Sequence, residues 1–284
     1  MPAVPGKQFP AGGTADPRQA VAAARLAGAV GLGSARGRAR RRPATCSPET
    51  PPETPPESPT RVPESPPESE EAAIAGAGLQ ASWAYAEDFL DEDDVLAGAR
   101  ARAEELGCVP VGPGVGAALR MLASAAGARA VVEVGTGTGV SGLWLLRGMR
   151  PDGVLTTVDV EPEHQRAAKD AFAEAGVMPN RARLIGGRAL DVLPRLTDGA
   201  YDLVFCDGDQ GENATYLEEA LRLLRPGGVV AFDDALWHHR VPDPAQRDPE
   251  TVSIRELGRT VRGDERLLPC LLPVGDGLLV GVKR

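Results

Sequence analysis

The 284-residue chain is poor in the side chains that most often bind metals, form cross-links or act as bases. It contains three histidines and three lysines, so a zinc site is not expected and a lysine base has few candidates. Its four cysteines, at positions 46, 108, 206 and 270, form no CxxC pair and indicate free thiols in a reducing cytosol. Aromatic residues are only 4%, so the core must consist mainly of Ala, Val and Leu.

Long apolar runs and an excess of positive charge are also missing. No run approaches the roughly 18 apolar residues that a transmembrane helix needs. The formal net charge is −9, whereas proteins that bind nucleic acids or anionic membranes normally carry a basic face. We therefore expect a cytoplasmic protein that binds neither nucleic acid nor membrane.

The composition changes near residue 79. Residues 1–78 hold more than half of the 26 prolines, repeat Pro-Glu-Thr/Ser-Pro, and include an arginine-rich block at 36–42. No aromatic residue or histidine occurs between Pro10 and Ser82, so this part cannot bury enough apolar surface to offset its ordering entropy. We predict a disordered tail over 1–78 and one folded domain over 79–284.

Helical and strand patterns alternate in the folded part. Strands are predicted at 130–134, 154–160, 181–185, 201–206, 229–232, 266–272 and 277–282; the helices are predicted at 84–106, 115–125, 140–149, 162–175, 189–196, 214–224 and 251–262. This alternation is typical of an α/β protein with a Rossmann-like, doubly wound sheet. The short connection before the last strand predicts a hairpin, so one of seven mostly parallel strands should be antiparallel.

A glycine-rich loop follows the first predicted strand in the segment Glu133-Val-Gly135-Thr-Gly137-Thr-Gly139. Glycines allow a tight turn and the close approach of a ligand, but Gly137 also begins a GxGxxG match typical of dinucleotide sites. The Glu133 carboxylate would suit a cationic amine and disfavour a pyrophosphate. Asp159 ends the next strand, where a carboxylate can bind a ribose diol in either ligand class. We favour S-adenosylmethionine over a nicotinamide cofactor.

Three carboxylates follow two further strands. Asp207 comes directly after residues 201–206, while Asp233 and Asp234 come after 229–232. Parallel strands bring these side chains to the edge of the sheet that carries the glycine loop. Converging carboxylates need a cation, and oxygen ligands select Mg²⁺, Mn²⁺ or Ca²⁺. The alternative is that Asp233 and Asp234 only cap a loop.

These motifs together resemble one enzyme family. The matching segments are 131–149, 155–164, 186–189 and 201–209, in that order. They resemble class I S-adenosylmethionine-dependent O-methyltransferases, and most closely actinobacterial-type members of the catechol/caffeoyl-CoA O-methyltransferase family. The resemblance spans about 83–283. It implies methylation of a hydroxyl on a small, catechol-like acceptor, assistance by a divalent cation (Mg²⁺ expected), and a homodimer.

The resemblance also implies a role for individual residues. The cofactor-binding positions are Val111, Glu133, Gly135, Thr136, Gly137 and Ser141 at the methionine end, Asp159 at the ribose, Val160, Arg188 and Ala189 at the adenine, and Asp209 beside the metal. The implied metal ligands are Asp207, Asp233 and Asp234, of which Asp207 is also assigned to catalysis. Simple packing is the alternative role for Val111 and Val160.

Two positions depart from the family pattern. The third metal ligand is usually Asn, and the general base is commonly a Lys where this chain has Gln210. The proton must then leave by metal-assisted ionisation, or to His238, His239 or Asp209, of which we favour His238. A methyltransferase with another acceptor and no metal, a cofactor-binding protein without turnover, and a NAD-binding oxidoreductase remain the alternatives.

Overall fold

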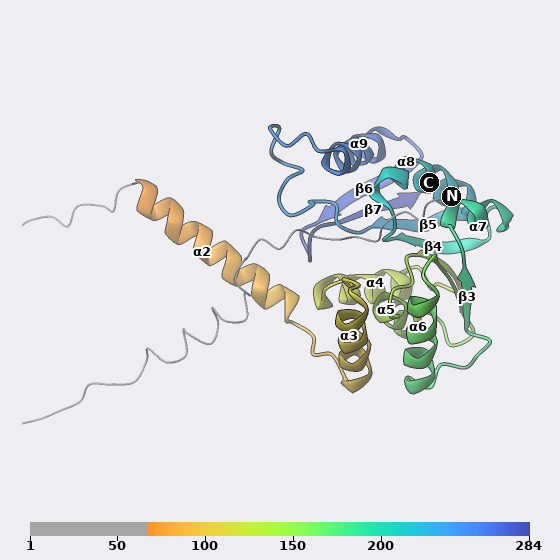
Figure 1. Ribbon diagram of the computed structural model, residues 1–284. Coiled ribbons are helices and arrows are strands. Elements are labelled where there is room, and N and C mark those ends of the chain that lie inside the picture. The colour runs from red at the N-terminus through yellow and green to blue at the C-terminus, as the bar shows by residue number, and fades with distance from the viewer. Residues whose placement is uncertain (1–67) are drawn as a thin grey trace, which may run out of the picture. The chain divides into compact units, whose positions relative to one another are not determined.

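The computed structural model describes residues 68–284, which contain a seven-stranded mixed sheet (Figure 1). The strands lie in the order β3-β2-β1-β4-β5-β7-β6. Their bounds are Ala130–Val134 (β1), Val154–Asp159 (β2), Ala182–Gly186 (β3), Tyr201–Cys206 (β4), Leu224–Phe232 (β5), Leu267–Leu272 (β6) and Leu278–Lys283 (β7). β7 points opposite to the other six strands and pairs antiparallel with both β5 and β6. The predicted fold class and the one antiparallel strand are thus confirmed.

The strand order reverses beside β1, which pairs in parallel with both β2 and β4. In this register Val134 lies opposite Val158 on one side and Cys206 on the other. The loops that follow these three strands therefore leave the sheet side by side. Such a switch point is where doubly wound folds bind their ligands.

Helices and short 3₁₀ turns connect the strands. They are α2 (Glu68–Glu87), α3 (Asp94–Leu106), α4 (Pro113–Ala125), α5 (Val140–Gly148), α6 (Pro162–Glu174), α7 (Ala189–Val192), η1 (Leu193–Arg195), η2 (Gln210–Glu212), α8 (Asn213–Leu223) and α9 (Pro249–Gly263). Proline occupies the first turn of α4, α6 and α9, where its missing N–H costs nothing. Within residues 68–284, none of the helices combines the length and the apolar character that a membrane span needs.

The helix predicted over 84–106 is wrong as a single element. The chain leaves α2 at Glu87 and starts α3 at Asp94. Between them, Asp93 takes an extended conformation, and its side chain accepts a hydrogen bond from the N–H of Leu96 at 3.1 Å. An aspartate at this N-cap position begins a new helix in place of continuing the old one.

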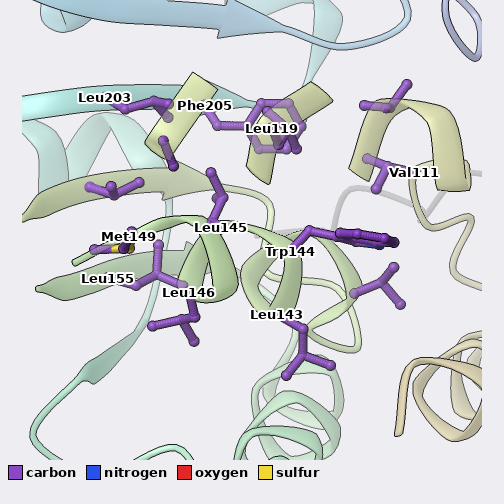
Figure 2. Packing of buried hydrophobic residues seen from close by; sticks show 14 of the residues in the cluster. Val111, Leu119, Leu143, Trp144, Leu145, Leu146, Met149, Leu155, Leu203 and Phe205 are labelled. Atoms are coloured by element: carbon purple, nitrogen blue, oxygen red, sulfur yellow. The ribbon is translucent and has the colours of Figure 1, made fainter. Parts of the chain in front are cut away.

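Apolar side chains fill both sides of the sheet. On one side, residues of α3, α4, α5 and α6 pack on the strands around Trp144, as Figure 2 shows with Leu119, Leu143 and Phe205. On the other side, α7, α8 and α9 pack on the alternate residues of the same strands. The inner strands β1, β2 and β4 are buried on both faces, which explains why their sequences read as short, continuous apolar runs, whereas the edge strands β3 and β6 are largely exposed or half-buried.

The boundary predicted near residue 79 lies inside α2, which already begins at Glu68. From Gly76 onward the side chains of α2 are exposed except at its last residue, Glu87. Residues 1–67 of the tail predicted over 1–78, with the proline repeats and the arginine block, lie outside the described residues.

Candidate active site

The glycine loop connects β1 to α5 through three residues with left-handed backbone. Gly135, Gly137 and Gly139 have φ values of 92°, 49° and 89°, which glycine adopts without a steric penalty. A Cβ on Gly135 would lie 2.3 Å from the carbonyl oxygen of Asp207 at the end of β4. The loop therefore packs directly on the end of the neighbouring strand β4. The tight glycine turn is as predicted, and its role as a ligand site stays a prediction.

Glu133 is a fully buried carboxyl group in β1, beside the glycine loop. Neither of its oxygens has a hydrogen-bond partner among the described residues. Burial, and to a smaller extent the charge of Asp159, raise the pKa of Glu133 to about 7, and the Ser141 and Thr157 hydroxyls oppose this rise. A buried carboxylate of this kind is costly unless a cation or donor meets it. The group is therefore suited to a cationic ligand.

Asp159 ends β2 and holds the glycine loop from the other side. Its Oδ2 accepts the Gly137 N–H at 2.9 Å, and its Oδ1 accepts the Glu161 N–H at 2.9 Å. The Nδ1 of His164 lies 3.4 Å from Oδ2. Burial would raise the pKa of Asp159, but the hydrogen bonds from His164, Glu161 and Gly137 hold it below its ordinary value. Asp159 is thus an ionised carboxylate at the predicted ribose position.

Other predicted cofactor residues surround these two carboxylates. Thr136 is buried, and its hydroxyl bonds to Thr157 (2.7 Å) and to the Nε2 of Gln165 (3.2 Å). Ser141 is buried in the first turn of α5. Val111 is buried before α4, and its carbonyl accepts a hydrogen bond from Arg100 at 2.7 Å.

The predicted adenine positions lie at the ends of β2 and β3. Val160 is exposed, whereas Ala189 is buried at the start of α7. Arg188 is exposed, and its guanidinium pairs with Glu212 at 2.7 Å. Tyr216 donates to the other oxygen of Glu212 at 2.6 Å, so this edge is organised by residues that the sequence did not single out.

Two of the predicted metal ligands follow neighbouring strands. Cys206 pairs with Phe232, so Asp207 and Asp233 leave β4 and β5 at the same level, and the Asp233 N–H donates to the Cys206 carbonyl at 3.1 Å. Asp234 has a positive φ of 56°. Among residues 68–284, however, no group of three or more His, Cys, Asp and Glu side chains is arranged to hold a metal ion. The metal site stays a prediction.

The loop after β5 contains three consecutive residues with left-handed backbone. Trp237, His238 and His239 have φ values of 47°, 54° and 64°, and each costs on the order of 1–3 kcal/mol in a non-glycine residue. Asp276, in the turn between β6 and β7, holds this loop. Its Oδ2 accepts the His238 N–H at 2.6 Å and lies 3.1 Å from the His238 Nδ1. Asp276 thus contacts both the backbone and the imidazole of His238.

Two residues near the predicted metal strand have structural roles. Asp209 accepts the Gly211 N–H at 2.8 Å and caps η2. Gln210, at the position of the family lysine, is buried, and its side-chain oxygen accepts a hydrogen bond from Asn213 at 2.8 Å. Sequence reasoning missed Asp276 and Gln165. A Gly-Asp-Gly turn before the last strand was the only local signal for Asp276.

The chain is similar to known proteins over its folded part. A family described as O-methyltransferase matches residues 89–284. A probable O-methyltransferase of Mycobacterium tuberculosis is 55% identical over 201 residues, which cover 71% of this chain and 90% of that protein. The O-methyltransferase TomG of Streptomyces achromogenes, solved with SAM, has a TM-score of 0.65 and 30% identity, covering 72% of this chain and 98% of TomG. An O-methyltransferase of Bacillus cereus, solved with SAH, has a TM-score of 0.65 and 26% identity, covering 72% and 99%.

Proposed function

The chain belongs to the O-methyltransferase family, and we propose that it transfers the methyl group of S-adenosylmethionine to a hydroxyl of a small, catechol-like acceptor. The observation that carries the cofactor assignment is the buried Glu133 carboxylate without a hydrogen-bond partner among the described residues. The α-amine of S-adenosylmethionine is a cation that would compensate this carboxylate. The structural relatives solved with SAM and SAH support the same ligand.

The carboxylates of Glu133 and Asp159 would bind different parts of the cofactor. Glu133 and Ser141 would hold the amine, and the N–H of Val111 would hold the carboxylate of the methionine end. Asp159 would accept the ribose hydroxyls, since its charge is maintained by the N–H groups of Gly137 and Glu161. When bound, S-adenosylmethionine supplies an electrophilic methyl group on a sulfonium and leaves as the neutral thioether.

His238 is the residue best suited to take the proton of the acceptor hydroxyl. Its Nδ1 lies 3.1 Å from the Oδ2 of Asp276, which fixes the orientation of the ring. The side chain is 60% exposed, so Nε2 is accessible to an acceptor. Gln210 is an amide and is buried, so it cannot replace the family lysine in this role.

The residues that would hold a divalent cation do not fit it as they lie. Asp207 and Asp233 leave adjacent strands, but the described side chains form no three-residue ligand group. The proposed proton transfer therefore involves only His238 and Asp276. Whether methyl transfer depends on a cation is tested separately, by assays in Mg²⁺ and in EDTA.

The dinucleotide alternative is disfavoured by the same buried carboxylate. A pyrophosphate at the glycine loop would meet Glu133, and two negative charges in a buried site repel strongly. S-adenosylmethionine places a cation there instead. A competition between NAD⁺ and S-adenosylhomocysteine distinguishes the two.

The function is tested by titrating S-adenosylhomocysteine into the full chain by calorimetry, and then by assaying methyl transfer to catechol with Mg²⁺ or with EDTA. We expect saturable binding, which Asp159→Ala weakens by roughly 1.5–3 kcal/mol through loss of charge-assisted hydrogen bonds. The exposed Asp170 of α6 offers a matched control, because Asp170→Ala should leave binding unchanged. Absence of binding would overturn the cofactor assignment. Catechol methylation in EDTA would show that no cation is needed.

A further inference from the structure

The last turns of α2 carry two side chains that contact α4, the loop after β5 and the turn between β6 and β7. Trp83 and Glu87 are four residues apart and therefore lie on one face of the helix. Both precede residue 89, where the match to the O-methyltransferase family begins. Their role is thus not part of what the family match describes.

Glu87 joins α2 to two other segments. One carboxylate oxygen accepts the Gly114 N–H at 2.9 Å, in the first turn of α4, and the other accepts the Gly275 N–H at 3.0 Å. The N-cap residue of α4 is Gly112, which has no side chain, so Glu87 supplies the acceptor for this helix start. A Cβ on Gly112 or Gly114 would lie 2.1 or 2.3 Å from the Glu87 carboxylate. These glycines make room for the contact.

The same face of α2 reaches the strained loop after β5. The Trp83 ring is stacked with the His239 ring, with centroids 6.2 Å apart and planes inclined by 8°. His239 follows His238, the proposed proton acceptor, which Asp276 holds. Asp276 in turn follows Gly275, the second partner of Glu87. Glu87 and Trp83 therefore contact both segments that position His238.

We propose that Trp83 is a specificity-determining residue for the acceptor, and that it forms with His239 a flat aromatic wall for a planar ring. The proposal rests on the proposed function, since it concerns the acceptor of that reaction. The Trp83 side chain is 40% exposed, so it still offers surface to a ligand, and parallel rings favour offset stacking with a further aromatic ring. Glu87 is a positioning residue that acts through Trp83.

The test uses the full chain saturated with S-adenosylhomocysteine in Mg²⁺ buffer, with catechol as the probe in calorimetry. Trp83→Ala should weaken catechol binding at least tenfold, whereas Trp83→Phe, which keeps an aromatic face, should weaken it less than threefold. The affinity for S-adenosylhomocysteine should stay within twofold in both. Tyr85→Ala removes another aromatic ring of the same helix, which is 72% exposed, and should change neither affinity.

The role of Glu87 is tested by non-additivity. Glu87→Gln keeps one acceptor oxygen and replaces the other by a donor, so it should weaken catechol binding in the wild-type background. In the Trp83→Ala background, Glu87→Gln should weaken catechol binding by less than a further twofold, because the effects of coupled residues are not additive. An additive effect would contradict the positioning role.

Each remaining outcome is decisive. Wild-type catechol affinity in Trp83→Ala, or equal losses for catechol and S-adenosylhomocysteine, would overturn the proposal. Binding of S-adenosylhomocysteine without any binding of catechol to the wild type would overturn the acceptor class and retain the cofactor. No binding of S-adenosylhomocysteine would overturn the proposed function itself.

Discussion

The two sides of the candidate site both depend on left-handed backbone, but they obtain it differently. On the cofactor side it occurs at Gly135, Gly137 and Gly139, where glycine adopts it freely. On the acceptor side it occurs at Trp237, His238 and His239, where every residue carries a Cβ that opposes it. The cofactor loop is therefore a property of its own sequence, whereas the acceptor loop must be held by the rest of the protein.

The contacts that hold the acceptor loop come from the turn between β6 and β7. The carbonyl of Asp276 accepts the Leu236 N–H at 2.8 Å, the carbonyl of Gly277 accepts the Ala235 N–H at 2.8 Å, and the Asp276 side chain binds His238. Backbone strain of this kind is common at functional sites, and it persists only where several contacts fix the conformation of the loop. From this difference we expect substitutions elsewhere in the protein to disturb the proposed acceptor loop more readily than the glycine loop.

Gly135→Ala should have the largest effect on folding, because it damages the packing of the glycine loop on the end of β4. The new Cβ would overlap the Asp207 carbonyl, and φ is 92°. We expect the free energy of unfolding to fall by roughly 2–4 kcal/mol, measured by urea denaturation. Gly186→Ala is the matched control, since no atom lies within 4 Å of its Cβ position. Equal stability of the two variants would show that the loop does not pack on β4.

His238→Asn should lower the rate of methyl transfer without changing the affinity for the cofactor product. We expect kcat for catechol to fall by roughly 10²–10⁴, the usual contribution of a general base, because the proton loses its acceptor. The affinity for S-adenosylhomocysteine should not change, since no cofactor residue contacts this loop through the His238 side chain. Asp276→Asn keeps the His238 base and should lower kcat less than His238→Asn does. Unchanged kcat in His238→Asn would remove this residue from the mechanism.

Glu133→Gln tests the cofactor side through its pH dependence. Folding raises the pKa of Glu133 from 4.5 to about 7, so the folded state binds a proton more tightly between these values. The free energy of unfolding of the wild type should therefore fall, relative to Glu133→Gln, as the pH rises from about 5 to 7, by roughly 3 kcal/mol at most. Urea denaturation of the ligand-free proteins measures this difference.

The same variant should bind S-adenosylhomocysteine roughly 10- to 100-fold more weakly at pH 8, because the amine loses a charged partner. In the wild type, binding near pH 6 should release a proton, which calorimetry in buffers of different ionisation enthalpy detects. Glu104→Gln, an exposed residue of α3, is the control for loss of one negative charge. If the free energy of unfolding depended on pH in the same way in the wild type and in Glu133→Gln, Glu133 would not titrate between about pH 5 and 7.

Removal of residues 1–67 should have the smallest effect. This part has no aromatic residue beyond Phe9 and is rich in proline, so we expect the melting temperature and the affinity for S-adenosylhomocysteine to change little. Removal of residues 1–87 should in addition weaken catechol binding, because it deletes Trp83 and Glu87. Equal catechol affinities in the two truncated proteins would place α2 outside the acceptor side.

The elements on the cofactor side could be predicted because each signal is local. The valine-rich strand, the glycines and the Asp159 position lie within one strand-loop-helix-strand unit, and the structure has them as expected. The single helix predicted over 84–106 is wrong for a local reason too, since Asp93 is an N-cap that begins a second helix at Asp94. The neighbouring positions of Asp207 and Asp233 followed from parallel strands alone.

By itself, the sequence determined the order of strands and helices, the doubly wound sheet and the cofactor loop, because periodicity and glycine conformation act over a few residues. Only the tertiary structure decided which residues organise the acceptor side. Glu87 and Gly275 are 188 positions apart, and His238 and Asp276 are 38 apart. Their contacts depend on how α2, α4 and the turn between β6 and β7 pack together, and no local pattern encodes that packing.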